Sequence, residues 1–199
     1  MTTVVPSPEP PAAKLTRRQA ELLDQLEQLF LAEGFARFTL DDLALRLRCS
    51  KSTLYALAGS KEQLAQRVIK HFFRKATDAV EARTVTVADP GLRVTAYLTA
   101  VGAALAPAGP AFHRDLDSFG PGREIYERNT ALAADRVRRL ISDGVAQGRF
   151  REVHPALVAD TVTTLMFRIG RGDTARATGL DDAAAYRELA ALLLHGITL

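Results

Sequence analysis

Residues 39–64 read TLDDLALRLRCSKSTLYALAGSKEQL. Two short apolar helical patterns surround a basic, hydroxyl-rich segment here, and residues 46–61 carry four basic side chains and no acidic one. Three interpretations are open at this point. The segment is a solvated turn, a phosphate-binding loop, or the part of a DNA-binding protein that enters a groove.

Local signals predict that this stretch begins with a short helix. Thr39 is an N-cap candidate, and Asp41 and Asp42 stand in the first turn, where the helix dipole favours negative charge. The apolar residues that follow recur with a helical period, at Leu40, Leu43, Ala44 and Leu47. A tight connection through residues 48–50 then leads to a second helix.

The second helix is predicted from Lys51 to about Leu57, with Ser50 as its cap. Its apolar residues Leu54 and Leu57 share one side, which leaves a mostly polar side formed by Lys51, Ser52, Tyr55 and Ala56. A helix-turn-helix needs this division, since one face packs and the other enters a major groove. The alternative is an αα-hairpin with a solvated polar face.

Helical patterns also flank the pair and continue to the end of the chain. The first covers residues 16–33 and stops at Gly34, and a long one follows the capping-box pattern Ser60-x-x-Gln63 to about Arg83. Asp89 and Pro90 begin a further helix through about residue 106, followed by a turn. The remaining patterns predict helices over 121–148, 155–170 and 181–196, with a loop over 171–180.

Between Phe30 and Leu64 the sequence contains a set of spaced residues, namely Phe30-x-x-x-Gly34-Phe35, Thr39-Leu40-x-x-Leu43-Ala44, Ser50, Leu54-Tyr55 and Ser60-Lys61-Glu62-x-Leu64. In these residues and their spacing the N-terminal part resembles the TetR family of transcriptional regulators. The resemblance implies an all-α fold with an N-terminal helix-turn-helix DNA-binding domain and a C-terminal helical domain for ligand binding and dimerisation. The expected parts are an N-terminal arm (1–14), the DNA-binding domain (15–60), a linking helix (61–84) and the C-terminal domain (85–199).

The resemblance also implies roles for individual residues. Thr39 caps its helix against a phosphate, residues 50–53 lie at the groove, Tyr55 touches a phosphate or a thymine methyl, and Lys61 holds the DNA backbone. The predicted DNA-binding residues are Thr39, Arg48, Ser50, Lys51, Ser52, Thr53, Tyr55 and Lys61. For three further basic residues a DNA contact and a solvated position are both open: Lys14, Arg17 and Arg18.

Two features depart from the family pattern. The turn reads Leu47-Arg48-Cys49-Ser50, where the family usually has small residues such as Ala-Gly-Val-Ser. Ala56, Leu57 and Ala58 stand where aromatic and histidine residues usually precede a phenylalanine. Cys49 suggests either a redox switch or a small buried apolar group, and the second is the commoner role of a lone cysteine.

Charge and composition narrow the class of protein. Residues 1–83 hold 13 Lys and Arg against 10 Asp and Glu, whereas the rest of the chain holds 13 of each, which places a basic patch on a nearly neutral body. A single cysteine rules out an internal disulfide and fits the cytoplasm. The N-terminus lacks the features of a signal peptide, and Pro107, Gly109 and Pro110 interrupt the uncharged stretch 94–113, so no membrane span is expected.

In the C-terminal domain, large and polar residues on the middle helices are candidates for an effector pocket: Tyr97, Phe112, His113, Phe119, Tyr126, Met166 and Phe167. The last two helices are apolar over more than one face, which predicts a symmetric four-helix dimer interface or burial within one subunit. The interface candidates are Val162, Met166, Leu189 and Leu193.

No enzyme, metal site or cofactor is expected. The triplet His113-Arg114-Asp115 lacks the glycine-rich loop and downstream asparagine of a kinase, and the histidines lack metal-ligand spacing. The sequence therefore predicts a cytoplasmic, ligand-responsive repressor that binds a palindromic double-stranded DNA operator as a homodimer and responds to a small apolar or weakly polar effector. The alternative is a dimer that binds DNA constitutively.

Overall fold

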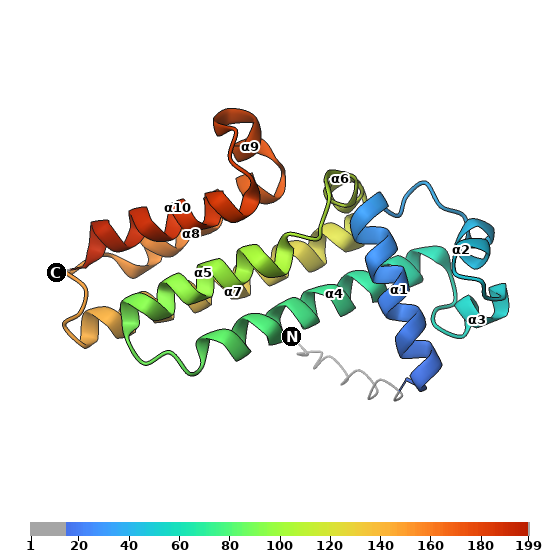
Figure 1. Cartoon of the computed structure of the whole chain (residues 1–199), viewed down its shortest axis with the longest axis horizontal. Coiled ribbons are helices and arrows are strands. Elements are labelled where there is room, and N and C mark those ends of the chain that lie inside the picture. The colour runs from blue at the N-terminus through green and yellow to red at the C-terminus, as the bar shows by residue number, and fades with distance from the viewer. Residues whose placement is uncertain (1–14, 199) are drawn as a thin grey trace, which may run out of the picture.

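The computed structural model describes residues 15–198, and the regular structure in this range is helical apart from an isolated antiparallel bridge between Phe150 and Thr198. The predicted all-α fold class is confirmed (Figure 1). The helices are α1 (Arg17–Glu33), α2 (Leu40–Arg46), α3 (Lys51–Tyr55), α4 (Lys61–Thr84), α5 (Pro90–Leu105), α6 (Pro110–Ser118), α7 (Gly120–Ala146), α8 (Pro155–Gly170), α9 (Asp173–Thr178) and α10 (Asp182–Ile197).

The N-caps observed in the structure lie where the sequence predicts the helices to begin. The side chains of Thr39, Ser50 and Ser60 each accept a hydrogen bond from the backbone N–H three residues on, and Asp89 caps α5 ahead of Pro90. The predicted capping box at Ser60 is only half formed. The side chain of Gln63 accepts from the N–H of Gly59 at 2.9 Å instead of from that of Ser60.

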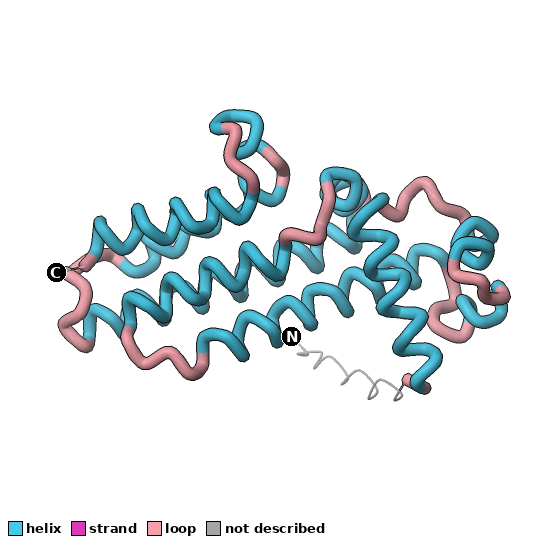
Figure 2. Tube along the Cα trace, viewed as in Figure 1, coloured by secondary structure: helices cyan, strands magenta, loops and turns pink. Residues whose placement is uncertain are grey.

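Two predicted connections contain helices. The turn expected after residue 106 leads into α6, and the loop expected over 171–180 contains α9 (Figure 2). Gly172 and Gly179, with φ of 72° and 76°, bound the short α9. The sequence did not reveal α9, because a short run of small and polar residues with a glycine at each end is typical of a loop.

The buried apolar residues form two clusters. One lies among α1 to α4 and includes Ala108, Phe112 and Leu116 from α6 and the turn before it. The other lies among α5, α7, α8 and α10 and includes Val80 from the far end of α4. In Figure 1, α4 runs from the N-terminal helices along the body, so this one helix joins the two clusters.

The predicted arm 1–14 lies outside the described residues. Within residues 15–198, no single helix is long and apolar enough to cross a bilayer, and α5 and α6 reach that length together only as a pair bent by 88°.

Candidate functional site

The α2–turn–α3 unit presents a polar face on an apolar support. Leu43, Leu54 and Leu57 are buried in the first cluster. Lys51 and Tyr55 are exposed on the opposite side of α3, together with Ser52 and Ala56, and Tyr55 keeps 51% of its surface open to solvent. The packing therefore produces the face that the spacing predicts, with its side chains available to a partner.

The turn between these helices contains a strained residue. Arg48 is exposed and adopts φ of 49°, in the left-handed region that glycine adopts freely. For a residue with a Cβ this conformation costs about 1–2 kcal/mol of backbone energy. The neighbouring Cys49 packs partly buried against the first cluster, and burial raises the pKa of its thiol, which disfavours the reactive thiolate.

The hydroxyl groups of the predicted groove segment lie close together. The Oγ of Ser50 is 2.7 Å from the Oγ of Ser52 and 2.8 Å from the Oγ1 of Thr53. At the start of α2, Thr39 donates its hydroxyl to Asp42 at 2.7 Å, and this bond is the main reason that the pKa of Asp42 is lowered. Thr39, Ser50 and Ser52 are exposed, whereas Thr53 is half-buried.

The two lysines that are predicted to contact DNA, Lys51 and Lys61, interact with other groups of the chain in this structure. The Nζ of Lys51 lies 2.6 Å from the Oδ1 of Asp41, and this hydrogen bond raises the pKa of the lysine. Lys61 donates to the carbonyl of Ala36 at 2.6 Å. Since these interactions lie near the surface, DNA phosphates can replace them at small cost.

The basic residues near the start of α1 are solvent-facing. Arg18 is exposed, and Arg17 forms an exposed pair with Glu21 at 2.8 Å. Lys14 lies outside the described residues. The positions of the two arginines are therefore compatible with both open interpretations, a DNA contact and a solvated side chain.

Helix α6 holds the connection between α1 and α2, a contact that the sequence analysis missed. The carboxylate of Asp115 accepts hydrogen bonds from the N–H groups of Phe35 (2.5 Å) and Ala36 (2.8 Å), and Gly109 donates its N–H to the carbonyl of Leu31 at 2.8 Å. These partners are about 80 residues apart in sequence, so no local pattern could have indicated the contact.

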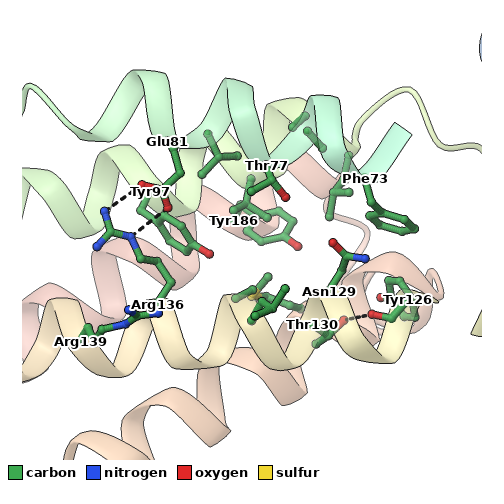
Figure 3. A pocket seen from close by; sticks show the side chains of 18 residues that line it. Phe73, Thr77, Glu81, Tyr97, Tyr126, Asn129, Thr130, Arg136, Arg139 and Tyr186 are labelled. Carbon is green, nitrogen blue, oxygen red and sulfur yellow. Dashed lines mark hydrogen bonds and ion pairs between the residues drawn. The ribbon is translucent and has the colours of Figure 1, made fainter. Parts of the chain in front are cut away.

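A cavity of about 260 Å³ opens among α4, α5, α7, α8 and α10 (Figure 3). Its lining is mostly apolar or aromatic and includes three of the predicted pocket residues, Tyr97, Tyr126 and Met166. Sequence reasoning missed several polar lining residues because they come from helices far apart in the chain. These are Thr77, Glu81, Asn129, Thr130, Arg136, Arg139 and Tyr186.

The other four predicted pocket residues lie elsewhere. Phe112 is buried in the first cluster and Phe119 packs partly buried against it, where both contact the ring of Phe35. Phe167 packs edge-on against Tyr126, with ring centroids 5.2 Å apart. His113 is half-buried beside Tyr126 and Gly170, and burial lowers its pKa. These four residues do not line this cavity: Phe112 and Phe119, in and next to α6, face the N-terminal core, and Phe167, on α8, packs on the ring of Tyr126. Their contact with an effector stays a prediction.

An ion pair stands in the cavity wall between α4 and α7. The guanidinium of Arg136 donates to both carboxylate oxygens of Glu81, at 2.9 and 3.0 Å. Burial, and then the Glu81 charge, raise the pKa of Tyr97 to about 12. The ion pair therefore ties the helix that carries the DNA-binding unit to the body (Figure 3).

The hydroxyl of Tyr186 is buried without a hydrogen-bond partner in the part of the chain that the structure describes. The ring lines the cavity, and Figure 3 shows the hydroxyl pointing into it. Burial raises the pKa of this phenol, so it stays a neutral donor. An unsatisfied buried hydroxyl costs about 1–3 kcal/mol, which favours an occupant with a polar atom.

Three of the four predicted dimer contacts are buried in the single chain. Val162, Met166 and Leu189 belong to the second cluster, which agrees with the alternative of burial within one subunit, and their contact with a partner stays a prediction. Leu193 is half-buried. The large apolar residues exposed on these helices are instead Leu157 and Leu192, because α8 and α10 turn their other faces into the body.

Three side chains of metal-ligating type meet between α1 and α4. Ligand atoms of Asp24, Glu27 and His71 lie within 4.8 Å of one another. However, the Nζ of Lys75 lies 2.9 Å from the Oδ1 of Asp24 and 3.0 Å from the Oε1 of Glu27. The ammonium already supplies a cation to both carboxylates, and the cluster acts as an ion-pair tie between the two helices.

Comparison with known proteins identifies the unit that carries the exposed face. Residues 22–68 match the family model described as "Bacterial regulatory proteins, tetR family". The uncharacterized HTH-type transcriptional regulator YfiR of Bacillus subtilis (strain 168) is 26% identical over 145 residues, which cover 70% of this chain and 71% of that protein. The N-terminal unit of this chain is therefore similar to the DNA-binding domain of TetR-family regulators. The family match and the relative, both described as regulatory proteins, support a DNA-binding transcriptional regulator.

Solved structures share the TetR-family fold over nearly the whole chain. A putative transcriptional regulator from Saccharomonospora viridis, in complex with choline, has a TM-score of 0.77 at 17% identity, covering 92% of this chain and 98% of its own. The TetR-family regulator PfmR from Thermus thermophilus has a TM-score of 0.64 at 23% identity, covering 87% of this chain and 97% of its own. These likenesses extend the shared architecture from the DNA-binding unit through the helical body.

Proposed function

We propose that this regulator is a ligand-responsive repressor that binds a palindromic operator as a homodimer and acts in the cytoplasm. The predicted DNA-binding unit, residues 39–61, enters the major groove, and the body binds a small effector. The observation that carries the proposal is the exposed polar face of α3, backed by buried Leu54 and Leu57, in a chain whose helical body contains a cavity. Division into a DNA-binding domain (15–60), linking helix (61–84) and body (85–199) remains part of the proposal.

The strained turn supports a DNA contact by Arg48. Strained backbone positions cluster at functional sites, and Arg48, with its positive φ, is exposed beside the start of α3. Its guanidinium has the geometry to bind either a phosphate or a guanine edge. Within the proposal, Arg48 and Lys51 are the main candidates for contacts with bases.

A homodimer fits the outer faces of α8 and α10. Leu157 and Leu192 keep 64% and 72% of their surfaces exposed, on helices whose inner faces are already buried. Covering such residues with a second copy removes apolar surface from water. In the proposed dimer, the two copies of α3 enter successive major grooves, about 34 Å apart on B-DNA.

If an effector in the cavity is to release the operator, the cavity must be connected to α3. Helix α4 supplies this connection, because residues from Phe73 to Glu81 line the cavity while Leu64 and Val68 pack in the N-terminal core. A ligand that binds better when α4 is displaced shifts the population toward a form whose recognition helices no longer match the grooves. The neighbour solved with choline supports a ligand-binding role for the body.

The deciding experiment is selection of bound duplexes from a random library, with the number of bound chains measured by sedimentation. Recovery of a two-fold-symmetric site bound by two chains is the expected result. Sequence-independent binding that depends steeply on salt would contradict specific operator recognition. If the selected operator is bound but a small-molecule screen never releases it, the constitutive alternative holds.

Lys61 gives a test of an individual contact. We expect Lys61→Ala to weaken binding to all sequences similarly and to reduce the slope of log affinity against log salt by about one, because one phosphate contact is lost. Lys70, which is exposed further along α4, provides the control through Lys70→Ala. An unchanged slope for Lys61→Ala would mean that Lys61 serves only to hold Ala36.

A further inference from the structure

The charged end of the cavity is asymmetric. The Arg136 side chain is 27% exposed, whereas that of Glu81 is 45% exposed, although the two form one ion pair. Glu81 can therefore turn into water and keep its solvation, while the more enclosed Arg136 stays beside the cavity. If the pair opens, the cavity keeps a guanidinium and loses a carboxylate.

The polar groups around the cavity are mainly hydrogen-bond donors. Arg136 and Arg139 both line it, although Arg139 is exposed and pairs with Asp135 at 2.7 Å, and the phenols of Tyr97 and Tyr186 add two more donors. The amide of Asn129 already donates to the carbonyl of Ile125 at 2.7 Å. Glu81 is the one carboxylate in the lining, and Arg136 holds it. A group that only accepts hydrogen bonds matches this wall best, and an ionised carboxylate is such a group.

The rest of the cavity suits an apolar body. From the charged end the wall continues over Val80, Val101, Ala104, Leu105 and Met166 toward Phe73 and Tyr126. Positions 126 and 136 of α7 are about 15 Å apart along the helix axis, at about 1.5 Å per residue. A chain or ring system of medium length fits beside that span.

We propose that the cavity binds an amphipathic carboxylate, whose carboxylate replaces Glu81 on Arg136 and whose apolar body extends toward Phe73 and Tyr126. This inference rests on the proposed function, since it names the chemical class of the effector. It also identifies the event that couples binding to α4. When the ligand takes Arg136, the ion pair between α4 and α7 is broken, and the α4 segment next to the cavity is free to move.

A cationic ligand is the competing class. Aromatic rings such as Tyr97, Tyr186 and Phe73 can surround a quaternary ammonium, and Glu81 could pair with it. For Glu81 to pair with that cation, Arg136, the less exposed member of the ion pair, would have to leave its place beside the cavity or stay there and repel the cation. The charges of the wall therefore favour an anion.

The test compares three probes of equal chain length that differ in the headgroup: decanoate, decanol and decyltrimethylammonium. Binding to the full chain without DNA is measured by isothermal titration calorimetry. We expect decanoate to bind about tenfold more tightly than either of the others, because it forms a charge-assisted pair. Equal affinities, tighter binding of the ammonium probe, or no binding of decanoate would overturn the proposal.

Two variants then locate the headgroup. Arg136→Met should abolish the preference for decanoate over decanol, and Glu81→Gln should strengthen decanoate binding because it removes the competing carboxylate. A gain of affinity cannot result from misfolding, so the second variant protects the test from a destabilised first one. Arg138→Met, on the same helix but outside the lining, is the matched control and should keep the preference. An unchanged preference in Arg136→Met would overturn the assignment.

Operator release separates this inference from the proposed function. If decanoate binds through Arg136 but leaves operator affinity unchanged, the ligand class stands and ligand-responsive regulation fails. If Glu81→Gln lowers operator affinity without any ligand, the ion pair is the coupling element. If Glu81→Gln leaves operator affinity unchanged, the coupling role of the pair is overturned.

Discussion

The N-terminal DNA-binding unit and the helical body are built from different kinds of information. In the first, hydroxyl caps at Thr39, Ser50 and Ser60 set the helix starts, and each bond joins residues three apart. In the body, the cavity lies between helices that are distant in sequence, and the ion pair in its wall joins Glu81 of α4 to Arg136 of α7, 55 residues later. Local chemistry therefore shapes the proposed DNA-contacting surface, whereas contacts between distant parts of the chain shape the site proposed to control it.

The two regions are coupled through helices that belong to both. Helix α4 contributes to both apolar clusters, and α6 follows a body helix in sequence but buries Phe112 and Leu116 in the N-terminal cluster. A change in either region can therefore reach the other through packing. Substitutions that act on one region at a time can measure how separate they are.

The largest expected effect comes from the N-terminal core. Leu43 has no exposed surface, so Leu43→Ala should lower the free energy of unfolding by about 3 kcal/mol and abolish DNA binding. Leu45, on the same helix, is 80% exposed, and Leu45→Ala should change stability by less than about 0.5 kcal/mol. Urea denaturation measures both. A single transition for Leu43→Ala would show that the two regions unfold together, whereas an early first step would show that they unfold separately.

A comparable test of the body uses Gly102. An added Cβ there would approach the Cδ2 of Tyr186 to 2.9 Å and its Cβ to 3.0 Å, so Gly102→Ala should destabilise the protein by about 2 kcal/mol and displace the cavity wall. At Gly196 an added Cβ meets nothing within 4 Å. Gly196→Ala should therefore stabilise by at most about 1 kcal/mol through helix propensity. Thermal unfolding distinguishes them, and equal effects would contradict the close approach to Tyr186.

The contact between the regions is tested at Asp115. Asp115→Ala leaves the N–H groups of Phe35 and Ala36 without their acceptor, so we expect a loss of about 1.5 kcal/mol. Operator binding should weaken as well, because the connection before α2 loosens. Asp117, on the same helix, forms a surface pair with Arg171 at 3.5 Å, and Asp117→Ala should change stability by less than about 0.5 kcal/mol. Hydrogen exchange at residues 35 and 36 reports the loosening directly, and unchanged protection would contradict the coupling.

The smallest predicted effect concerns the turn. Arg48→Gly should raise the free energy of unfolding by about 0.5–1 kcal/mol, because glycine relieves the positive φ at some entropic cost. Arg48→Ala removes the same charge without relieving the backbone and should give no such gain. We expect both variants to weaken operator binding equally. If Arg48→Ala is as stable as Arg48→Gly, the backbone strain is absent.

Much of the DNA-binding unit was predictable from sequence. Its caps, its buried leucines and the exposed face of α3 depend on residues one to four positions apart, which is the range of helical periodicity. In the body, helix starts at Asp89 and Pro155 were equally readable. The short α9 was not, because glycine at both ends hides a helix of six residues.

The effector cavity was only partly predictable. Tyr97, Tyr126 and Met166 were identified by size and by position on middle helices, and the same reasoning included Phe112 and Phe119, which do not line it. Side-chain size does not reveal in which direction a helix points its large residues. The chain bends by 88° between α5 and α6, so the residues of α6 face another part of the molecule than those of α5. Glu81, Arg136 and Tyr186 have no local signal, because their significance lies in which helices meet.

The sequence by itself determined an all-helical chain, a helix-turn-helix with a polar recognition face, and a likeness to the TetR family. These depend on capping, periodicity and short spacing, which act over a few residues. Only the tertiary structure decided that Asp115 holds the connection before α2, that Glu81 and Arg136 tie α4 to the body, and that Val162, Met166 and Leu189 are buried in the core. Each of these requires helices far apart in the chain to pack in one particular way, and packing is fixed by the whole set of contacts together.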